Sequence, residues 1–212
     1  MNKRMFLKVL IFLPLFLGAC GITEELEQAK NSVNDLKVNI ETQTKNYQQL
    51  SLYLNEIPEA FTTDMEASPE TGLFPEDTGA IFDNYTLRQE LHQEMVSQQK
   101  AIKKHKKSLD QTIKNNGADV DNAQLKLISN SLSIIISNFD SLSIYVETSI
   151  AQEIDFYADL PSDNMAEELS IVQRTYGAMD IISEEAEANN TYTLSLIKTF
   201  IKEAPKSKEK SK

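Results

Sequence analysis

Cys20 is the residue in this chain that most clearly invites chemistry. It is the only cysteine among 212 residues, so no internal disulfide can form. The chain starts with basic residues, continues as an apolar segment over residues 9–17, and places the small residues Gly18 and Ala19 directly before the thiol. A basic start, a short apolar segment and a small-residue cleavage site form the layout of a secretory signal. We therefore expect residues 1–19 to be removed during export.

The motif formed by Leu17, Gly18, Ala19 and Cys20 resembles the lipobox of bacterial lipoproteins, in which the thiol is diacylated and the chain is cut before it. The apolar segment before it is too short for a stable membrane span, which needs roughly 20 residues. The resemblance implies diacylglycerol on Cys20 and a lipid-anchored place on the extracytoplasmic face of the cell membrane. A stray buried thiol is the alternative, and it fits the end of an export signal poorly.

The other residues that could do chemistry form no recognised site. His92 and His105 are isolated, and we expect each on a helix surface or at the edge of a buried stripe. No paired Glu-x-x-His, His-Glu-x-x-His, glycine-rich phosphate loop or Gly-x-Ser-x-Gly elbow occurs. Six carboxylates within residues 58–79 lack the pattern of a calcium loop. We therefore expect no catalysis, no metal and no cofactor besides the lipid, with an unrecognised site in residues 58–79 as the enzyme alternative.

The charge of the chain is strongly acidic. The net charge is −11, and removal of residues 1–19 makes it −14. Nucleic-acid binding needs a concentrated basic footprint, so we do not expect it. A basic run on the second expected helix, residues 103–107, is interpreted as a solvated face in preference to a polyanion contact.

Residues 205–212 form a basic end on this acidic chain. They contain Lys206, Lys208, Lys210 and Lys212 with a single Glu, and nothing apolar to bury, so we expect disorder. The lysines could contact anionic phospholipid or a cell-wall polymer. A merely solubilising end is the alternative.

Apolar residues recur with the 4-3 spacing that helices bury in bundles and coiled coils. The pattern predicts helices over residues 22–57, 80–114, 121–160 and 162–204. Pro58 indicates a stop or a kink near the end of the first, and residues 58–79 are predicted to form a long loop. We expect Gly117 to end the second helix, Asp119 or Asp121 to cap the third, and Ser162 or Asp163 to cap the fourth.

These elements predict an all-α fold, an elongated antiparallel bundle of about four helices in one domain over residues 20–204. The third helix is apolar over a wide arc, so we expect it at the hydrophobic centre. The second is the most polar, so we expect it to be the least buried. Exposed seam residues between Leu91 and Ile113 would indicate a protein partner there. We expect Asn190, within the seam of the fourth helix, to fix register.

The whole layout resembles the YkyA-type putative cell-wall-binding lipoproteins of Gram-positive bacteria. A lipobox is followed at once by long heptad helices and a lysine-rich end. The resemblance implies a lipid-anchored, non-catalytic envelope protein that binds a cell-wall polymer. The alternative is a scaffold or regulator that pairs its helices with another envelope protein.

Overall fold

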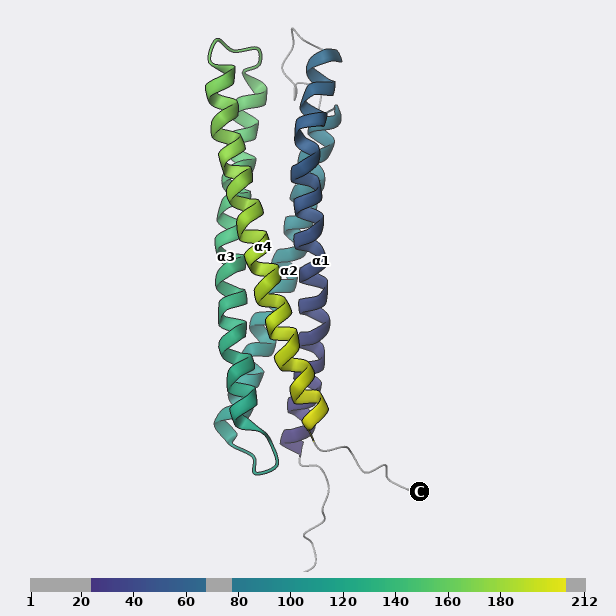
Figure 1. Cartoon of the computed structure of the whole chain (residues 1–212), viewed down its shortest axis with the longest axis vertical. Helices are drawn as coiled ribbons and strands as arrows, with labels where there is room; N and C mark the ends of the chain where they lie inside the picture. The colour runs from purple at the N-terminus through teal and green to yellow at the C-terminus, as the bar shows by residue number, and fades with distance from the viewer. Residues whose placement is uncertain (1–23, 68–77, 205–212) are drawn as a thin grey trace, which may run out of the picture.

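Heptad stripes on four successive segments produce four long helices, packed side by side in the computed structural model (Figure 1). The structure describes residues 24–67 and 78–204. Its helices are α1 (Glu24–Ala67), α2 (Ala80–Asn115), α3 (Asn122–Ala158) and α4 (Met165–Glu203). Successive helices run in opposite directions, and each packs against the two that adjoin it, in the cyclic order α1, α2, α3, α4. The predicted antiparallel helical bundle is confirmed.

The buried stripes match the predicted seams closely. On α1, every seam position within the helix is buried, from Leu26 to Ile57, and α3 behaves in the same way from Leu125 to Phe156. The buried apolar residues form two clusters, one toward each end of the bundle. A polar layer lies between the clusters. In it Gln43 donates to the side chain of Gln99 at 3.2 Å.

Helix α1 does not stop at Pro58, so the prediction of a loop beginning there is wrong. The helix runs nine residues further, to Ala67. Proline in a helix interior costs about 3 kcal/mol, because it removes one backbone hydrogen bond and crowds the preceding turn. Packing beyond it offsets the cost. The ring of Phe61 stacks on Phe156 with 6.0 Å between centroids and lies 6.1 Å from the ring of Tyr157.

The last turn of α1 also completes the start of α2. Gly79 precedes α2 and has no side chain to cap it. The carboxylate of Asp64 accepts hydrogen bonds from the backbone amides of Ala80 at 2.9 Å and Ile81 at 2.8 Å. A capping carboxylate satisfies amides that have no partner within their own helix and favours the positive end of the helix dipole. Residues 68–77 of the predicted loop lie outside the described residues.

Helix α3 is not the centre of the bundle, contrary to prediction. In a ring of four helices each one buries a single stripe, and the helices that flank α3 are α2 and α4. Its second apolar stripe therefore faces outward, and Leu127, Ile134, Ile144 and Ile154 are exposed.

The predicted caps are partly right. Asp121 accepts a hydrogen bond from the backbone amide of Gln124 at 2.9 Å and caps α3, as expected. Asn116, not Gly117, takes the left-handed conformation after α2, with φ 53°. Asparagine tolerates this region better than other non-glycine residues do. Asn164 occupies the N-cap position of α4 in place of Ser162 or Asp163, and its side chain makes no capping hydrogen bond.

Candidate functional site

The ends of the described chain lie together at one end of the bundle. Glu24, where α1 begins, and Ala204, just after α4, lie at the lower end in Figure 1, and the α3–α4 turn lies at the upper end. Leu26 and Ala204 line the same small cavity, which has a volume of about 70 Å³. The expected lipidation motif, Leu17 to Cys20, and the four lysines of residues 205–212 are outside the described residues. In the sequence Cys20 precedes Glu24 by only four positions.

The exposed apolar surface is concentrated on one side of the molecule. Of the eleven large hydrophobic side chains that are exposed in the described residues, eight belong to α3 or α4. We call this surface the α3–α4 face: Leu127, Ile134, Ile144, Tyr145, Ile154, Ile171, Ile181 and Tyr192. Ile144 is 64% exposed and Ile181 is 66% exposed. A concentration of exposed large apolar side chains on two neighbouring helices is typical of interaction sites.

Helix α2 does not carry the exposed seam that would have indicated a protein partner there. Leu91, Met95, Ile102 and Leu109 are buried, and Ile113 is half-buried. The exposed apolar surface is therefore on α3 and not on α2. The sequence contained a signal for it, because α3 carries apolar residues on both sides of its seam.

The basic run on α2 is a partly paired surface. Lys103 donates to Asp140 of α3 at 2.9 Å, and Lys106 donates to Asp110 one turn along at 2.8 Å. Lys104 and Lys107 are exposed. Exposed pairs of this type contribute little stability, roughly 0–1 kcal/mol. The arrangement agrees with the interpretation of this run as a solvated face.

The upper half of the bundle buries an ion pair. Arg88 of α2 donates two hydrogen bonds to the carboxylate of Glu153 of α3, and the Nη1–Oε1 distance is 2.7 Å. Asn84 accepts from Nε of Arg88 at 2.8 Å, and Ser149 donates to Glu153. The guanidinium also lies 5.6 Å from the ring centroid of Tyr176. Each guanidinium nitrogen of Arg88 and each carboxylate oxygen of Glu153 thus has a hydrogen-bond partner, which is typical of a structural pair.

The position of Arg88 in the heptad pattern could have indicated its burial, because it lies on the α2 seam between Tyr85 and Leu91. A charged side chain is, however, rarely buried without a partner. Burial alone would lower the pKa of Arg88, but hydrogen bonding to Glu153 and the charge of Glu153 outweigh it, so that the pKa is raised. The guanidinium therefore stays charged, and Glu153 must be present to balance it.

Some other polar groups in the interior also have partners, whereas Oδ1 of Asn190 and the hydroxyls of Tyr47 and Ser183 have no hydrogen-bond partner among the described residues. Asn190 of α4 donates to the hydroxyl of Thr44 of α1 at 3.1 Å, in the seam where a register-fixing residue was expected. His92 is half-buried, and its Nε2 lies 2.7 Å from the hydroxyl of Ser143. Burial lowers the pKa of His92, and the charge of Glu147 opposes this shift. His105 is half-buried as well.

The larger cavity lies between α3 and α4, toward the upper end. Its volume is about 200 Å³, and its lining combines apolar side chains with carboxylates: Gln152, Asp155, Phe156, Asp159, Glu168, Ile171 and Val172. The lining contains no cysteine, histidine, lysine or arginine. Over residues 24–67 and 78–204, no three residues of the metal-ligating types are grouped so as to hold an ion.

Comparison of the chain with protein-family models, with curated proteins and with solved structures gives no match. No helix in the described ranges is both long and apolar enough to cross a membrane.

Proposed function

We propose that this protein is a lipid-anchored, extracytoplasmic component of the cell envelope that works by binding and not by catalysis. Support for the anchor comes from the sequence, in which a secretory signal ends in Leu17, Gly18, Ala19 and Cys20. Two acyl chains on one cysteine give stable membrane attachment. Because the described helix α1 begins only four residues later, such an anchor would hold the bundle by its lower end.

We infer that the bundle binds another envelope protein through the α3–α4 face. The observation that carries this inference is the placement of eight of the eleven exposed large hydrophobic side chains of the described residues on α3 and α4. Between them, α3 presents small polar residues such as Ser137 and Ser141, which let a partner approach closely. A partner helix with an apolar stripe fits such a surface.

Binding of an anionic cell-wall polymer is the second candidate, and the family resemblance is its main support. It would depend on lysines, chiefly those of residues 205–212, because the chain as a whole is acidic. The two candidates differ in the surface that they use. Lysines would mediate the wall contact, and apolar side chains of α3 and α4 would mediate the protein contact.

Site-specific photo-crosslinking in the cells that make the protein tests the preferred candidate. A photoreactive amino acid at Ile144 or Ile181 should give discrete adducts with one protein. The same residue at Val38 or Leu52 of α1, which are 61% and 55% exposed, should give none. The control positions match the test positions in residue type and exposure, so that a difference reports on the face and not on accessibility.

A second variant tests whether formation of the adduct depends on the apolar surface. Ile144→Asp should abolish the adduct formed from Ile181, because a charge would have to be buried in the contact. Val38→Asp, the matched substitution on α1, should leave it unchanged. Adducts of equal yield from both sides of the bundle, or none from α3 and α4, would exclude this binding face.

A further inference from the structure

The α3–α4 face is acidic as well as apolar. Residues 122–203, which make up α3, α4 and the turn between them, contain thirteen carboxylates and four basic residues, a net charge of −9. Helices α1 and α2 together contain thirteen carboxylates and ten basic residues, a net charge of −3. The side of the bundle that exposes most of the large apolar side chains therefore also carries most of the net negative charge.

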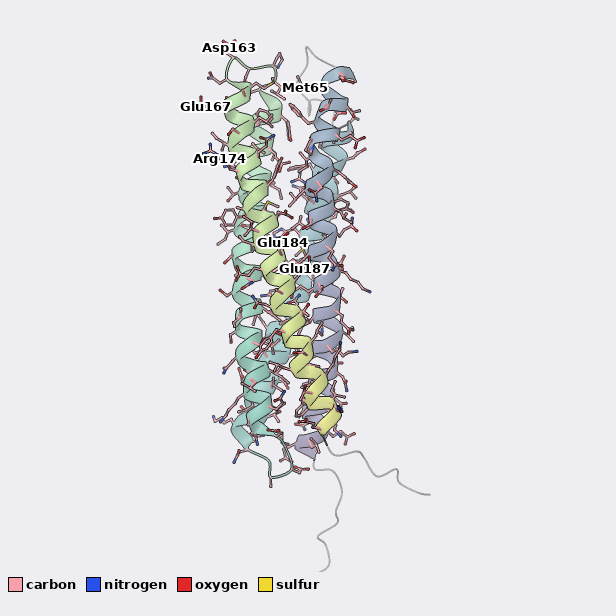
Figure 2. The ribbon with its side chains drawn as sticks, in the orientation of Figure 1. Met65, Asp163, Glu167, Arg174, Glu184 and Glu187 are labelled. Atoms are coloured by element: carbon pink, nitrogen blue, oxygen red, sulfur yellow. The ribbon has the colours of Figure 1, made fainter. Side chains whose placement is uncertain are left out.

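The two properties coincide in the upper half of the α3–α4 pair, residues 141–183. This segment holds five of the eight side chains of the α3–α4 face and eight carboxylates, of which Glu153 is paired with Arg88. Its single basic residue is Arg174. Figure 2 shows Asp163 and Glu167 at the upper end of the pair, with Arg174 below them on α4. An apolar surface surrounded by negative charge fits a partner that is apolar along one stripe and basic beside it.

The cavity of about 200 Å³ lies on the same side of α3 as the exposed apolar side chains. Ile134 and Tyr145 are eleven positions apart, which places them along one side of the helix. Gln152 and Asp159, seven and fourteen positions after Tyr145, line the cavity. Ile171 of α4, which is 41% exposed, belongs both to the α3–α4 face and to the lining. The apolar stripe therefore leads upward into the cavity.

The lining of this cavity combines buried apolar residues with carboxylates near the solvent. Phe156 and Val172 are buried, Glu168 is half-buried, and Asp155 and Asp159 are exposed. None of the three carboxylates forms an ion pair within residues 24–67 and 78–204. A lysine or arginine side chain suits such a lining, because its methylene groups pack against apolar atoms while its charged end meets the carboxylates.

We propose that the partner segment on the α3–α4 face is a cationic amphipathic helix, one of whose lysine or arginine side chains enters the cavity lined by Asp155, Asp159 and Glu168. This inference rests on the proposed function, in which the face binds another envelope protein. The apolar stripe of that helix packs on the exposed apolar side chains of α3 and α4. Tyr145 precedes Asp155 by ten positions, about 15 Å along the helix axis, so that in the partner about ten positions separate the cation from the apolar residue on Tyr145.

The charge of the face argues against two other occupants of an apolar surface. Two copies of this chain anchored by the same end would lie parallel, so that the cavity carboxylates of one copy would face those of the other. Like charges brought together at an interface oppose association. An anionic bilayer would be repelled by the same carboxylates. A chain of opposite charge is the occupant that the face favours.

Photo-crosslinking of the full-length protein in the cells that make it can identify the bound segment. Adducts formed from photoreactive residues at Ile171 and Ile181 are digested with a protease that does not cut at lysine or arginine, and the attached peptides are sequenced by mass spectrometry. Both peptides should come from one helical segment of one protein, with attachment sites about ten positions apart. The segment should carry net positive charge, with a lysine or arginine within one turn of the site reached from Ile171.

A charge-neutral variant tests the cavity itself. It combines Asp155→Asn, Asp159→Asn and Glu168→Gln. The yield of the adduct formed from Ile181 should fall about tenfold in this variant, because the partner's cation loses its carboxylates. In isolated membranes, about 1 M salt should lower the yield from the unsubstituted cavity as well, since screening then acts over about 3 Å.

A matched variant of α1 controls for the change in net charge. It combines Glu56→Gln, Glu59→Gln and Glu66→Gln, three exposed positions in the upper half of the bundle. It removes the same charge as the cavity variant and should leave the yield from Ile181 unchanged. Circular dichroism should show the same helical content in both variants, so that a difference in yield reports on the cavity.

The outcomes distinguish this inference from the proposed function. Adducts with a neutral or acidic segment, or equal yields from the two charge variants, would overturn the cationic helix and leave the α3–α4 face as a binding surface. Adducts with a second copy of this chain or with lipid would assign the face to that occupant instead. Absence of any adduct from Ile144, Ile171 and Ile181 would overturn the proposed function and this inference together.

Discussion

Arg88 and Glu153 place opposite charges where water cannot reach them. Their side chains are 1% and 0% exposed. Desolvating two charges costs about as much as their attraction returns, so a buried pair adds little net stability, but either partner left alone is a severe liability. The hydrogen bonds from Arg88 to Asn84 and from Ser149 to Glu153 specify which two residues of α2 and α3 must lie side by side. We therefore expect the pair to determine how α2 and α3 align more than it adds to stability.

A double-mutant cycle tests this role. Arg88→Met or Glu153→Met alone should lower the free energy of unfolding by about 3–5 kcal/mol, because each leaves one buried charge uncompensated. The double variant should lie within about 1 kcal/mol of the unsubstituted protein. Urea denaturation of the four proteins measures all three values. Additive losses in the double variant would mean that the two side chains act independently.

His92 should make the stability depend on pH. Burial lowers its pKa in the folded protein, whereas the unfolded chain protonates it at the ordinary value of about 6.5. The unfolded state therefore binds more protons below that pH, and stability falls as the pH drops from 7.5 to 5.5. His92→Gln should show a smaller loss over this range in urea denaturation at both pH values. An identical loss in the variant would assign the pH dependence to other groups.

Pro58 shows at the scale of a whole helix how packing overrides a local preference. The two turns after it carry Phe61, which contacts Phe156 and Tyr157, and Asp64, which caps α2. A helix end placed at Pro58 would forfeit both interactions. The proline persists in α1 because the residues beyond it contact α2 and α3.

Replacing Pro58 with alanine should therefore stabilise the bundle. The substitution restores a backbone donor and relieves crowding in the preceding turn, which should raise the free energy of unfolding by about 1–3 kcal/mol. Thermal unfolding followed by circular dichroism measures the change. Glu59→Ala, on the adjoining position, should change stability by less than about 0.5 kcal/mol. A destabilised Pro58→Ala variant would indicate that the proline sets a helix geometry on which Phe61 depends.

The sequence predicted the positions of the helices better than it predicted which of their side chains are exposed. A 4-3 repeat identifies the residues that one face buries, which is why the α1 seam from Leu26 to Ile57 could be predicted in full. It does not say whether a second apolar stripe, such as that of Ile134 and Ile144, meets another helix or remains open. That outcome depends on how many neighbours a helix has. Arg88 was missed for a related reason, since its burial requires Glu153 of another helix.

At the scale of the whole molecule, attachment to the membrane should depend on one atom, the Sγ of Cys20. Cys20→Ala should move the protein from the membrane fraction to the soluble fraction, because the acyl chains have no other site. Its helical content should not change, since the described helices begin at Glu24. Fractionation and circular dichroism provide the two measurements, with Ser137→Ala, an exposed position on α3, as the control. Membrane retention of the Cys20 variant would remove the basis of the lipoprotein interpretation.

Because residues 24 and 204 lie at the same end of the bundle, attachment there would also determine how far the opposite end stands from the membrane. A bundle attached by that end would raise the α3–α4 turn about 60 Å above the headgroups, roughly twice the thickness of the hydrocarbon core. Ile144 and Ile181, near the midpoints of their helices, would lie at about half that elevation. The molecule would then hold a bound partner at a fixed distance from the bilayer. Its height could change only in steps of whole heptads, about 10 Å each, made in all four helices at once.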